Sequence, residues 1–146
     1  MGYSYHRTVH LADTDAAGVI YFASLLNLCH EAYEHCLSEV GLNWQHLLEA
    51  KEFALPIIHA EIDFLRPVHW DDRLIIELFP VSDAPSQFMV RYQILLAIAD
   101  QSPSKPVAIA ITKHVAISPQ TRQRRPLPAI LEKWLKNGPK YPEQKK

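Results

Sequence analysis

Two carboxylates, a glycine and the start of a helical pattern fall within ten residues near the N-terminus. Asp13 and Asp15 bracket Thr14, and Gly18 follows them. An apolar pattern with helical spacing begins at Phe22. An Asx turn, a helix cap and a glycine turn would give the same pattern. A carboxylate beside a helix N-terminus also has a chemical use, because unpaired N–H groups polarise a bound carbonyl while the acid attacks it or activates water. The spacing therefore favours acyl transfer.

The spacing of the possible metal ligands in this chain does not fit a known metal-binding motif. Alternating acids open the calcium loop of EF-hands, but here the glycine is misplaced, and Val19 and Ile20 fill the space that the loop needs. His30 and His35 flank two glutamates as in a zinc protease motif. They are five residues apart, however, and so point about 140° apart around a helix. We therefore expect no metal and no other cofactor.

The composition is typical of one cytoplasmic domain with an ordinary core. The chain has 146 residues, 48% of them hydrophobic, and its 15 basic residues nearly balance 16 acidic ones. This neutrality gives no bias toward nucleic acid or a membrane surface. We see no signal peptide and no apolar run that could span a bilayer. Cys29 and Cys36 lie about 10.5 Å apart along one predicted helix, too far for a disulfide, so we expect two reduced core residues.

The periodicity predicts a single α+β domain over residues 1–137, followed by a disordered tail over 138–146. Its main helix runs from Phe22 to Val40 and is ended by Gly41. One helix followed by four consecutive strands indicates an antiparallel meander packed on a helix. The predicted strands are Tyr3–Leu11, Ile57–Arg66, Leu74–Val81, Gln87–Ala99 and Val107–Ile117, the shorter helices are Trp44–Lys51 and Ala129–Lys136, and Ser82–Ser86 is a predicted turn.

The stretch from Asp13 to Ala23, Asp-Thr-Asp-Ala-Ala-Gly-Val-Ile-Tyr-Phe-Ala, resembles the signature of the hotdog-fold acyl-CoA thioesterases, in the 4-hydroxybenzoyl-CoA thioesterase family. The resemblance continues to Gly41 and again through Asp63–Val68 and Asp72, so it covers nearly the whole chain. It implies a five-stranded antiparallel sheet wrapped around the central helix. It also implies homo-oligomers, with active sites at the interface of each pair of subunits and pairs that commonly form tetramers.

The resemblance also implies the two main catalytic groups. The second acid of the motif is the essential one in this family, which makes Asp15 the expected catalytic carboxylate, while Asp13 shapes the turn. The family's oxyanion donor is a backbone N–H at the helix start, here that of Phe22. Whether Asp15 attacks the carbonyl or activates water stays open. Gly18 has no Cβ, so the backbone can bend there and a thioester can approach closely.

Four further residues are candidates for binding the acyl group. Val19, Ile20 and Tyr21 can supply apolar wall beside the acidic stretch. His30 borders the apolar stripe of the helix, at the position where the hydroxybenzoyl-CoA thioesterases carry an aspartate that contacts the substrate hydroxyl. The departure from aspartate argues against hydroxybenzoate and for another hydroxylated aromatic acid, while a histidine at the rim without a substrate contact remains the alternative.

Arg122, Arg124 and Arg125 form the densest basic cluster, which either is a solvated loop or binds the phosphates of coenzyme A. The cluster is too short to predict binding of nucleic acid. Other basic groups that could hold coenzyme A are Arg66, Arg91 and Lys113.

Within the family, the likeness is greatest to members that hydrolyse 1,4-dihydroxy-2-naphthoyl-CoA in phylloquinone biosynthesis, so we expect an aromatic acyl-CoA as substrate. The alternatives are a thioesterase for short-chain acyl-CoA or acyl carrier protein thioesters, and a non-catalytic acyl-CoA-binding module. Asp15 argues against the binding module, because a binder gains nothing from a carboxylate beside the thioester.

Overall fold

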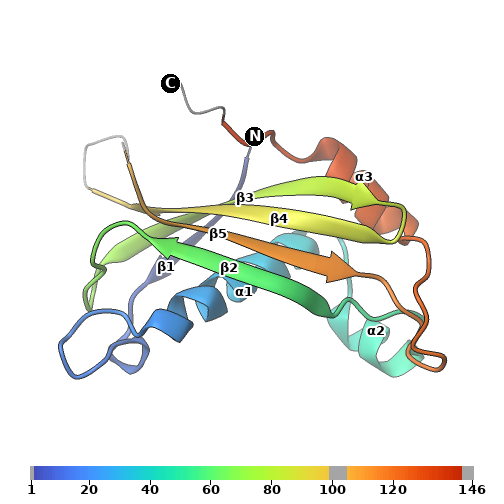
Figure 1. Ribbon diagram of the computed structural model, residues 1–146, viewed down its shortest axis with the longest axis horizontal. Coiled ribbons are helices and arrows are strands. Elements are labelled where there is room, and N and C mark those ends of the chain that lie inside the picture. The colour runs from blue at the N-terminus through green and yellow to red at the C-terminus, as the bar shows by residue number, and fades with distance from the viewer. Residues whose placement is uncertain (1, 99–104, 143–146) are drawn as a thin grey trace.

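The computed structural model describes residues 2–98 and 105–142, in which one antiparallel sheet of five strands lies over the long helix α1 (Figure 1). The strand order across the sheet is β1-β3-β4-β5-β2. The strands are β1 (Tyr3–Thr8), β2 (Ile57–Phe64), β3 (Arg73–Ala84), β4 (Gln87–Leu96) and β5 (Pro106–Val115), and the helices are α1 (Phe22–Glu39), α2 (Trp44–Ala50) and α3 (Ala129–Asn137).

The predicted meander of four strands is wrong in one respect, because β2 does not pair with β3. Strands β3, β4 and β5 form a meander, whereas β2 pairs with β5 and β1 pairs with β3. The first two strands along the chain therefore form the two edges of the sheet. All neighbouring pairs are antiparallel, as predicted.

Helix α1 packs on the sheet through the face that the sequence predicts, with two differences. Leu25 and Leu37 are fully buried, and each contributes about 2 kcal/mol to the stability of the fold because its apolar surface is removed from water. Phe22 and Val40, which the apolar pattern included, are exposed at the two ends, and Leu28 is buried instead. The complete set of buried residues on the helix is Leu25, Leu28, Cys29, Ala32, Tyr33, Cys36 and Leu37.

Two predicted boundaries differ from the observed ones, the first because a side chain binds a backbone group and the second because the strand register shifts. The first strand ends at Thr8 rather than Leu11, because a 3₁₀ turn over Leu11–Asp13 forms with the Asp13 carboxylate accepting from the His10 N–H. The predicted turn over Ser82–Ser86 shrinks, because β3 continues to Ala84 through a shift in register.

Both cysteines are free and buried, as predicted, and Cys36 Sγ accepts a hydrogen bond from Trp134 Nε1 at 3.3 Å. The helices of the described residues are all too short or too polar to span a lipid bilayer. Ala99, the predicted end of the strand that begins at Gln87, lies outside the described residues, as do residues 143–146 of the predicted tail.

Candidate active site

Asp13 holds the turn before the acidic loop. Its Oδ2 atom accepts hydrogen bonds from the His10 N–H at 2.8 Å and from Arg7 NH1 at 2.9 Å. The Arg7 Nε atom also donates to Glu31 on α1 at 3.0 Å, so this guanidinium ties the turn to the helix. Asp13 is thus engaged on the inner side of the loop, in the turn-shaping role that the sequence analysis gave it.

Asp15 has a different environment, with an exposed side chain. Its Oδ1 atom accepts from the Ala17 N–H at 2.8 Å, which is the bond of an Asx turn. Within residues 2–98 and 105–142, no group donates to its second oxygen, Oδ2. The turn therefore fixes the carboxylate by one oxygen and leaves the other available for chemistry.

The loop that carries Asp15 is fastened to the segment that follows β2. The Ile20 N–H donates to the Val68 carbonyl at 2.7 Å, and the Trp70 N–H donates to the Gly18 carbonyl at 3.2 Å. Gly18 has φ of +78°, a left-handed conformation that glycine adopts without cost, and no heavy atom lies within 4 Å of where its Cβ would be. This position is therefore both open and bent, as close approach of a thioester requires.

Helix α1 begins without a side-chain cap. Tyr21 is the N-cap residue in an extended conformation, and no side chain accepts from the first turn. The Tyr21 N–H donates to the Asp13 carbonyl at 2.8 Å, and the Ser24 N–H donates back to the Tyr21 carbonyl at 2.9 Å. In the part of the chain that the structure describes, the N–H group of Phe22 has no acceptor. It is free to donate to a developing oxyanion.

The apolar residues of the loop divide between the core and the surface. Ile20 is buried in the core cluster and Val19 is half-buried. The rings of Tyr21 and Phe22 are exposed and tilted against one another, with centroids 4.8 Å apart. Among the wall residues that the sequence predicts, Tyr21 therefore offers the most surface to a ligand.

His30 lies at a cavity of about 440 Å³ beneath the second half of α1. The cavity is mostly apolar, and α2 together with the segment leading into β2 forms its other walls. Its lining includes His30, Tyr33, Trp44, Leu47, Phe53 and Leu55. The volume is within the range of small-molecule sites.

Next to Tyr33, which lines the cavity, the core contains buried polar groups that the sequence did not indicate. Tyr33 and His114 are both buried, and their rings stack with centroids 4.6 Å apart. His114 Nε2 lies 2.8 Å from Thr112 Oγ1, which in turn lies 3.2 Å from the hydroxyl of Tyr92. Burial, and then the neighbouring His30, lower the pKa of His114 to about 4, so its imidazole is neutral at pH 7. Only Tyr33 carried a sequence signal, and that signal was apolar periodicity.

The cavity and the Asp15 loop are well separated within one chain. The rise of an α-helix places Tyr33 about 16 Å along the axis from Phe22. The Asp15 loop is bonded to residues just after β2, whereas Phe53 and Leu55 in the cavity wall lie just before β2. The two features therefore lie at opposite ends of this strand (Figure 1).

The basic cluster lies at the same end of β2 as the cavity. Arg125 NH1 donates to the Glu52 carbonyl at 2.8 Å, and its guanidinium lies 5.6 Å from the centre of the Phe53 ring. Arg124 NH1 donates to Gln87 Oε1 at 3.2 Å. Arg122 and Arg124 are exposed, whereas Arg125 is half-buried and holds the backbone beside the cavity.

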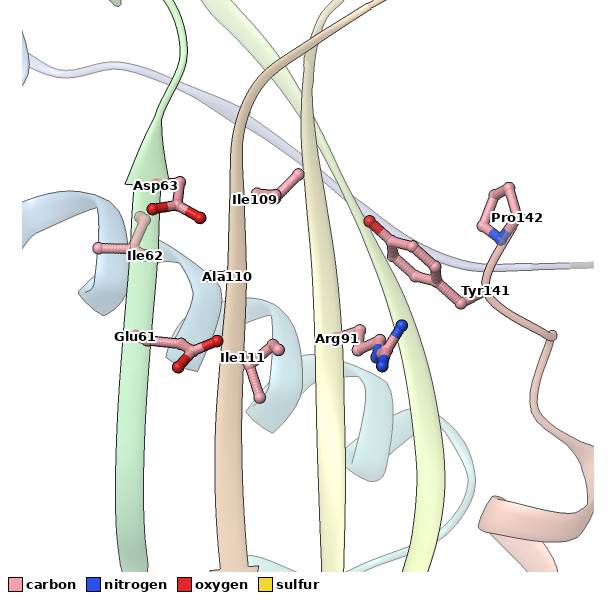
Figure 2. Close-up of a pocket in the computed structure, with 9 residues that line it drawn as sticks. All are labelled: Glu61, Ile62, Asp63, Arg91, Ile109, Ala110, Ile111, Tyr141 and Pro142. Atoms are coloured by element: carbon pink, nitrogen blue, oxygen red, sulfur yellow. The ribbon is translucent and has the colours of Figure 1, made fainter. Parts of the chain in front are cut away.

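A second hollow lies on the opposite face of the sheet. Figure 2 shows α1 behind the strands and the hollow in front of them, with Glu61 and Asp63 from β2 on one side and Arg91 and Tyr141 on the other. Its volume is about 420 Å³. The Arg91 guanidinium lies 5.0 Å from the centre of the Tyr141 ring. Of the residues that the sequence analysis put forward for substrate binding, it contains Arg91 alone, which was an alternative for coenzyme A.

Comparison with known proteins shows the family of this chain. The sequence model of the thioesterase-like superfamily matches residues 9–135. A 1,4-dihydroxy-2-naphthoyl-CoA hydrolase from a Picosynechococcus species is 54% identical over 145 residues, which are 99% of each chain. A relative of the same name from Rippkaea orientalis is 50% identical over 133 residues, 91% of this chain and 94% of the relative.

A solved structure agrees with these sequence matches. The crystal structure of a 1,4-dihydroxy-2-naphthoyl-CoA thioesterase from Synechocystis has a TM-score of 0.86 to this chain at 39% identity, and covers 94% of this chain and 97% of that one. The predicted hotdog fold is confirmed, with α2 and α3 added to the central helix and the five-stranded sheet. Since the matched residues include the Asp15 loop, α1 and strands β2 to β5, this chain belongs to the thioesterase-like superfamily.

Proposed function

We propose that this protein hydrolyses 1,4-dihydroxy-2-naphthoyl-CoA to 1,4-dihydroxy-2-naphthoate and CoA, the thioester step of phylloquinone biosynthesis. The observation that carries the proposal is the Asp15 loop, where an exposed carboxylate with one free oxygen precedes the uncapped start of α1. The choice of acyl group rests on the relatives, which bear this activity in their names at 54% and 50% identity.

In the proposed reaction Asp15 acts on the thioester carbonyl, either directly or through a water molecule that it deprotonates. Either route places a negative charge on the carbonyl oxygen in the tetrahedral intermediate. The free N–H of Phe22 donates to that oxygen, and the dipole of α1 adds to the stabilisation. Collapse of the intermediate breaks the carbon–sulfur bond and releases CoA as the thiolate. In the water route this step also releases the acid, and the proton that Asp15 took from water passes to the thiolate. In the direct route the acyl group stays on Asp15 as an anhydride, which a water molecule hydrolyses to release the acid, and a proton from that water protonates the thiolate.

We further propose that the active site forms between two copies of the chain that pair through β2. Both faces of β2 are largely exposed, and in the described residues its only hydrogen-bonded neighbour is β5. The other edge strand, β1, is instead covered by α1 through the Arg7–Glu31 pair. Ile58 and Phe64 on β2 are 50% and 48% exposed. Apolar side chains exposed on an unpaired edge strand favour association with another chain.

Antiparallel pairing of two β2 strands would also complete the site. The start of one β2 would then lie beside the end of the other, so the cavity at His30 in one subunit would face the Asp15 loop of its partner. This arrangement removes the separation of about 16 Å along α1 that keeps the two features apart within one chain. The acyl group would occupy the cavity, with Tyr21 of the partner covering its entrance. Whether pairs assemble further into tetramers is a separate prediction.

The substrate proposal is tested with a hydrolysis panel. We expect kcat/KM to be highest for hydroxylated naphthoyl-CoA, lower for benzoyl-CoA and lowest for short-chain and long-chain acyl-CoAs, because a mostly apolar cavity of about 440 Å³ suits a flat bicyclic acid. Short-chain acyl-CoAs turned over faster than aromatic ones would reject the substrate assignment and leave the thioesterase chemistry in place.

The shared site is tested by complementation. Asp15→Asn removes the carboxylate, and Ala54→Trp fills the cavity from its wall, so each variant alone should be inactive. Co-expressed subunits that pair at random would regain about a quarter of the wild-type sites, because half the dimers combine one intact loop with one intact cavity. Activity that stays at the level of the separate variants would place the whole site within one chain. Light scattering at the chain mass of 16.7 kDa for a fully active species would reject pairing itself.

Arg122 and Arg124 are the proposed contacts for the phosphates of coenzyme A, because they are exposed at the same end of β2 as the cavity. Arg125, the third arginine of the cluster, is less accessible to coenzyme A, because it is half-buried and its NH1 atom donates to the Glu52 carbonyl. A double Arg→Gln variant at the two exposed positions should raise KM similarly for every acyl group and leave kcat unchanged, since phosphate binding is the same in the ground state and the transition state.

A further inference from the structure

One guanidinium lies between two carboxylates at the base of the Asp15 loop. Arg7 NH1 donates to Asp13 Oδ2 at 2.9 Å, and Arg7 Nε donates to Glu31 Oε2 at 3.0 Å. The third nitrogen, NH2, lies 3.5 Å from the remaining oxygen of each carboxylate. Charge-assisted bonds from a planar guanidinium to two carboxylates fix their relative positions more tightly than a single surface ion pair does. The base of the loop is therefore held by a rigid polar bridge.

This bridge attaches a turn that has no buried residue of its own. None of the residues of the 3₁₀ turn over Leu11–Asp13 is buried. Among residues 2–98 and 105–142, the bridge through Arg7 is the only side-chain hydrogen bonding between this turn and α1. Strand β1 is held by its pairing with β3, and α1 is held by its buried apolar face. The specific effect of Arg7 is therefore to fix the turn against the helix.

The backbone of Asp13 connects this bridge to both proposed catalytic groups. Asp13 lies two residues before Asp15, and its carbonyl accepts from the Tyr21 N–H at 2.8 Å. Tyr21 is the N-cap of α1 and directly precedes Phe22, whose N–H is the proposed oxyanion donor. Between these points the chain closes as a loop, in which the Asp15 N–H donates to the Val19 carbonyl at 2.9 Å. A shift of Asp13 would therefore move the carboxylate relative to the helix start.

We propose that Arg7 is a positioning residue for the reaction, which sets the Asp15 carboxylate relative to the Phe22 N–H by holding Asp13 against α1. This role rests on the proposed function for the parts played by Asp15 and Phe22, and it adds the group that fixes them relative to one another. Catalytic groups must be held to within about 0.5 Å of the productive geometry, and a misplacement of about 1 Å can lower a rate about 10²-fold. Because Arg7 acts through Asp13 and takes no part in binding the substrate, its loss should lower kcat and leave KM unchanged.

The test compares Arg7→Gln with the same exchange at Arg73. Arg73 lies opposite Thr8 in the register of β1 and β3, next to the position of Arg7, and its side chain is exposed. Arg7→Gln should lower kcat about tenfold, with KM unchanged, on whichever acyl-CoA the wild type hydrolyses fastest. Arg73→Gln should keep the wild-type values of both constants. An unchanged kcat in Arg7→Gln, or an effect on KM alone, would overturn the proposal.

A second comparison separates positioning from a general loss of stability. In an Asp15→Asn background there is no carboxylate to place, so adding Arg7→Gln should lower the residual rate less than about twofold. A further loss of about tenfold in that background would mean that Arg7 acts independently of Asp15, and would overturn the proposal. All rates are measured well below the melting temperature of each variant, so that unfolded protein does not contribute to the loss.

NMR of the backbone amides tests the same role without catalysis. Among the described residues, Asp15, Gly18 and Phe22 make no hydrogen bond to Arg7. Their N–H signals should nevertheless shift in Arg7→Gln and stay at the wild-type positions in Arg73→Gln, because the loop follows Asp13. Unmoved signals of these three groups in Arg7→Gln would overturn the proposal. A wild type that hydrolyses no acyl-CoA would reject the proposed function, whereas shifts confined to the loop would still support the role of Arg7 in placing Asp15.

Discussion

Exchanging each of the two motif acids for its amide should separate catalysis from stability. In Asp15→Asn the amide keeps the Oδ1 acceptor, so the bond from the Ala17 N–H at 2.8 Å persists. The side chain is exposed and pairs with no cation among the described residues, so the free energy of unfolding should change by less than about 0.5 kcal/mol. The amide is neither a nucleophile nor a base, however. We expect kcat to fall by about 10²–10⁴.

Asp13→Asn is the matched control, because the chemical change is the same two residues away. The side chains of Arg7 and Asp13 are only 14% and 16% exposed, and they are joined at 2.9 Å. The amide keeps the acceptor for the His10 N–H but loses the charge, which leaves Arg7 with Glu31 as its remaining partner. We expect the unfolding free energy to fall by about 1–2 kcal/mol and kcat to fall less than tenfold.

The assay combines steady-state hydrolysis of an aromatic acyl-CoA with chemical unfolding of the same protein samples. The expected pattern crosses over, with the larger loss of kcat in Asp15→Asn and the larger loss of stability in Asp13→Asn. If Asp15→Asn keeps more than about a tenth of wild-type turnover, the catalytic assignment is refuted, because a general base contributes at least about 10²-fold to the rate. A stability loss in Asp15→Asn as large as that in Asp13→Asn would refute the reading of the loop geometry.

Three further changes test the buried histidine beside Tyr33, the packing of the chain after α3, and the backbone beside the cavity. His114, with its pKa lowered to about 4 from 6.5, binds protons more weakly in the folded state than in the unfolded state, so wild type should lose about 2–3 kcal/mol of stability as pH falls from 6.5 to 4. His114→Phe should lack this part of the acid sensitivity in unfolding titrations, and identical slopes for both proteins would contradict the shift. Gly138→Ala should lower the free energy of unfolding by about 1–3 kcal/mol, because a Cβ at this position would lie 2.7 Å from Cγ of the buried Pro80. Calorimetric unfolding measures the loss, and an unchanged melting temperature would contradict the close contact between Gly138 and Pro80. Arg125→Gln should lower the unfolding free energy by about 1 kcal/mol through loss of its bond to the Glu52 carbonyl, and denaturant titration that detects no change would return this arginine to the candidates for coenzyme A.

The acidic loop could be predicted from sequence because its structure is local. The Asx turn at Asp15, the left-handed Gly18 and the uncapped helix start depend on residues within ten positions of one another. Turn and cap preferences act over that range, so the chain alone specifies the geometry. The same reasoning explains why α1 was placed to within one residue of its observed end.

The cavity could not be predicted, because it depends on contacts between distant positions. Tyr33, Trp44, Phe53 and His114 meet only after α1, α2 and β5 have packed together. In the sequence Tyr33 is one more apolar position of a helix, and His114 is one residue of an alternating strand. Periodicity reports which face is buried and carries no information about which polar atoms find partners there.

The exposed side of β2 is where the sequence pattern and the single chain disagree most, and the disagreement is informative. Alternation from Ile58 to Phe64 predicts a strand with one buried apolar face, such as β3, β4 and β5 have. In the folded chain every residue of β2 except Ile62 is exposed. A period-2 apolar pattern on an edge strand with an open row of backbone groups is otherwise a site of uncontrolled association. The proposed pairing through β2 would resolve both problems at once, because the apolar face that is exposed in one chain would be buried against the second copy.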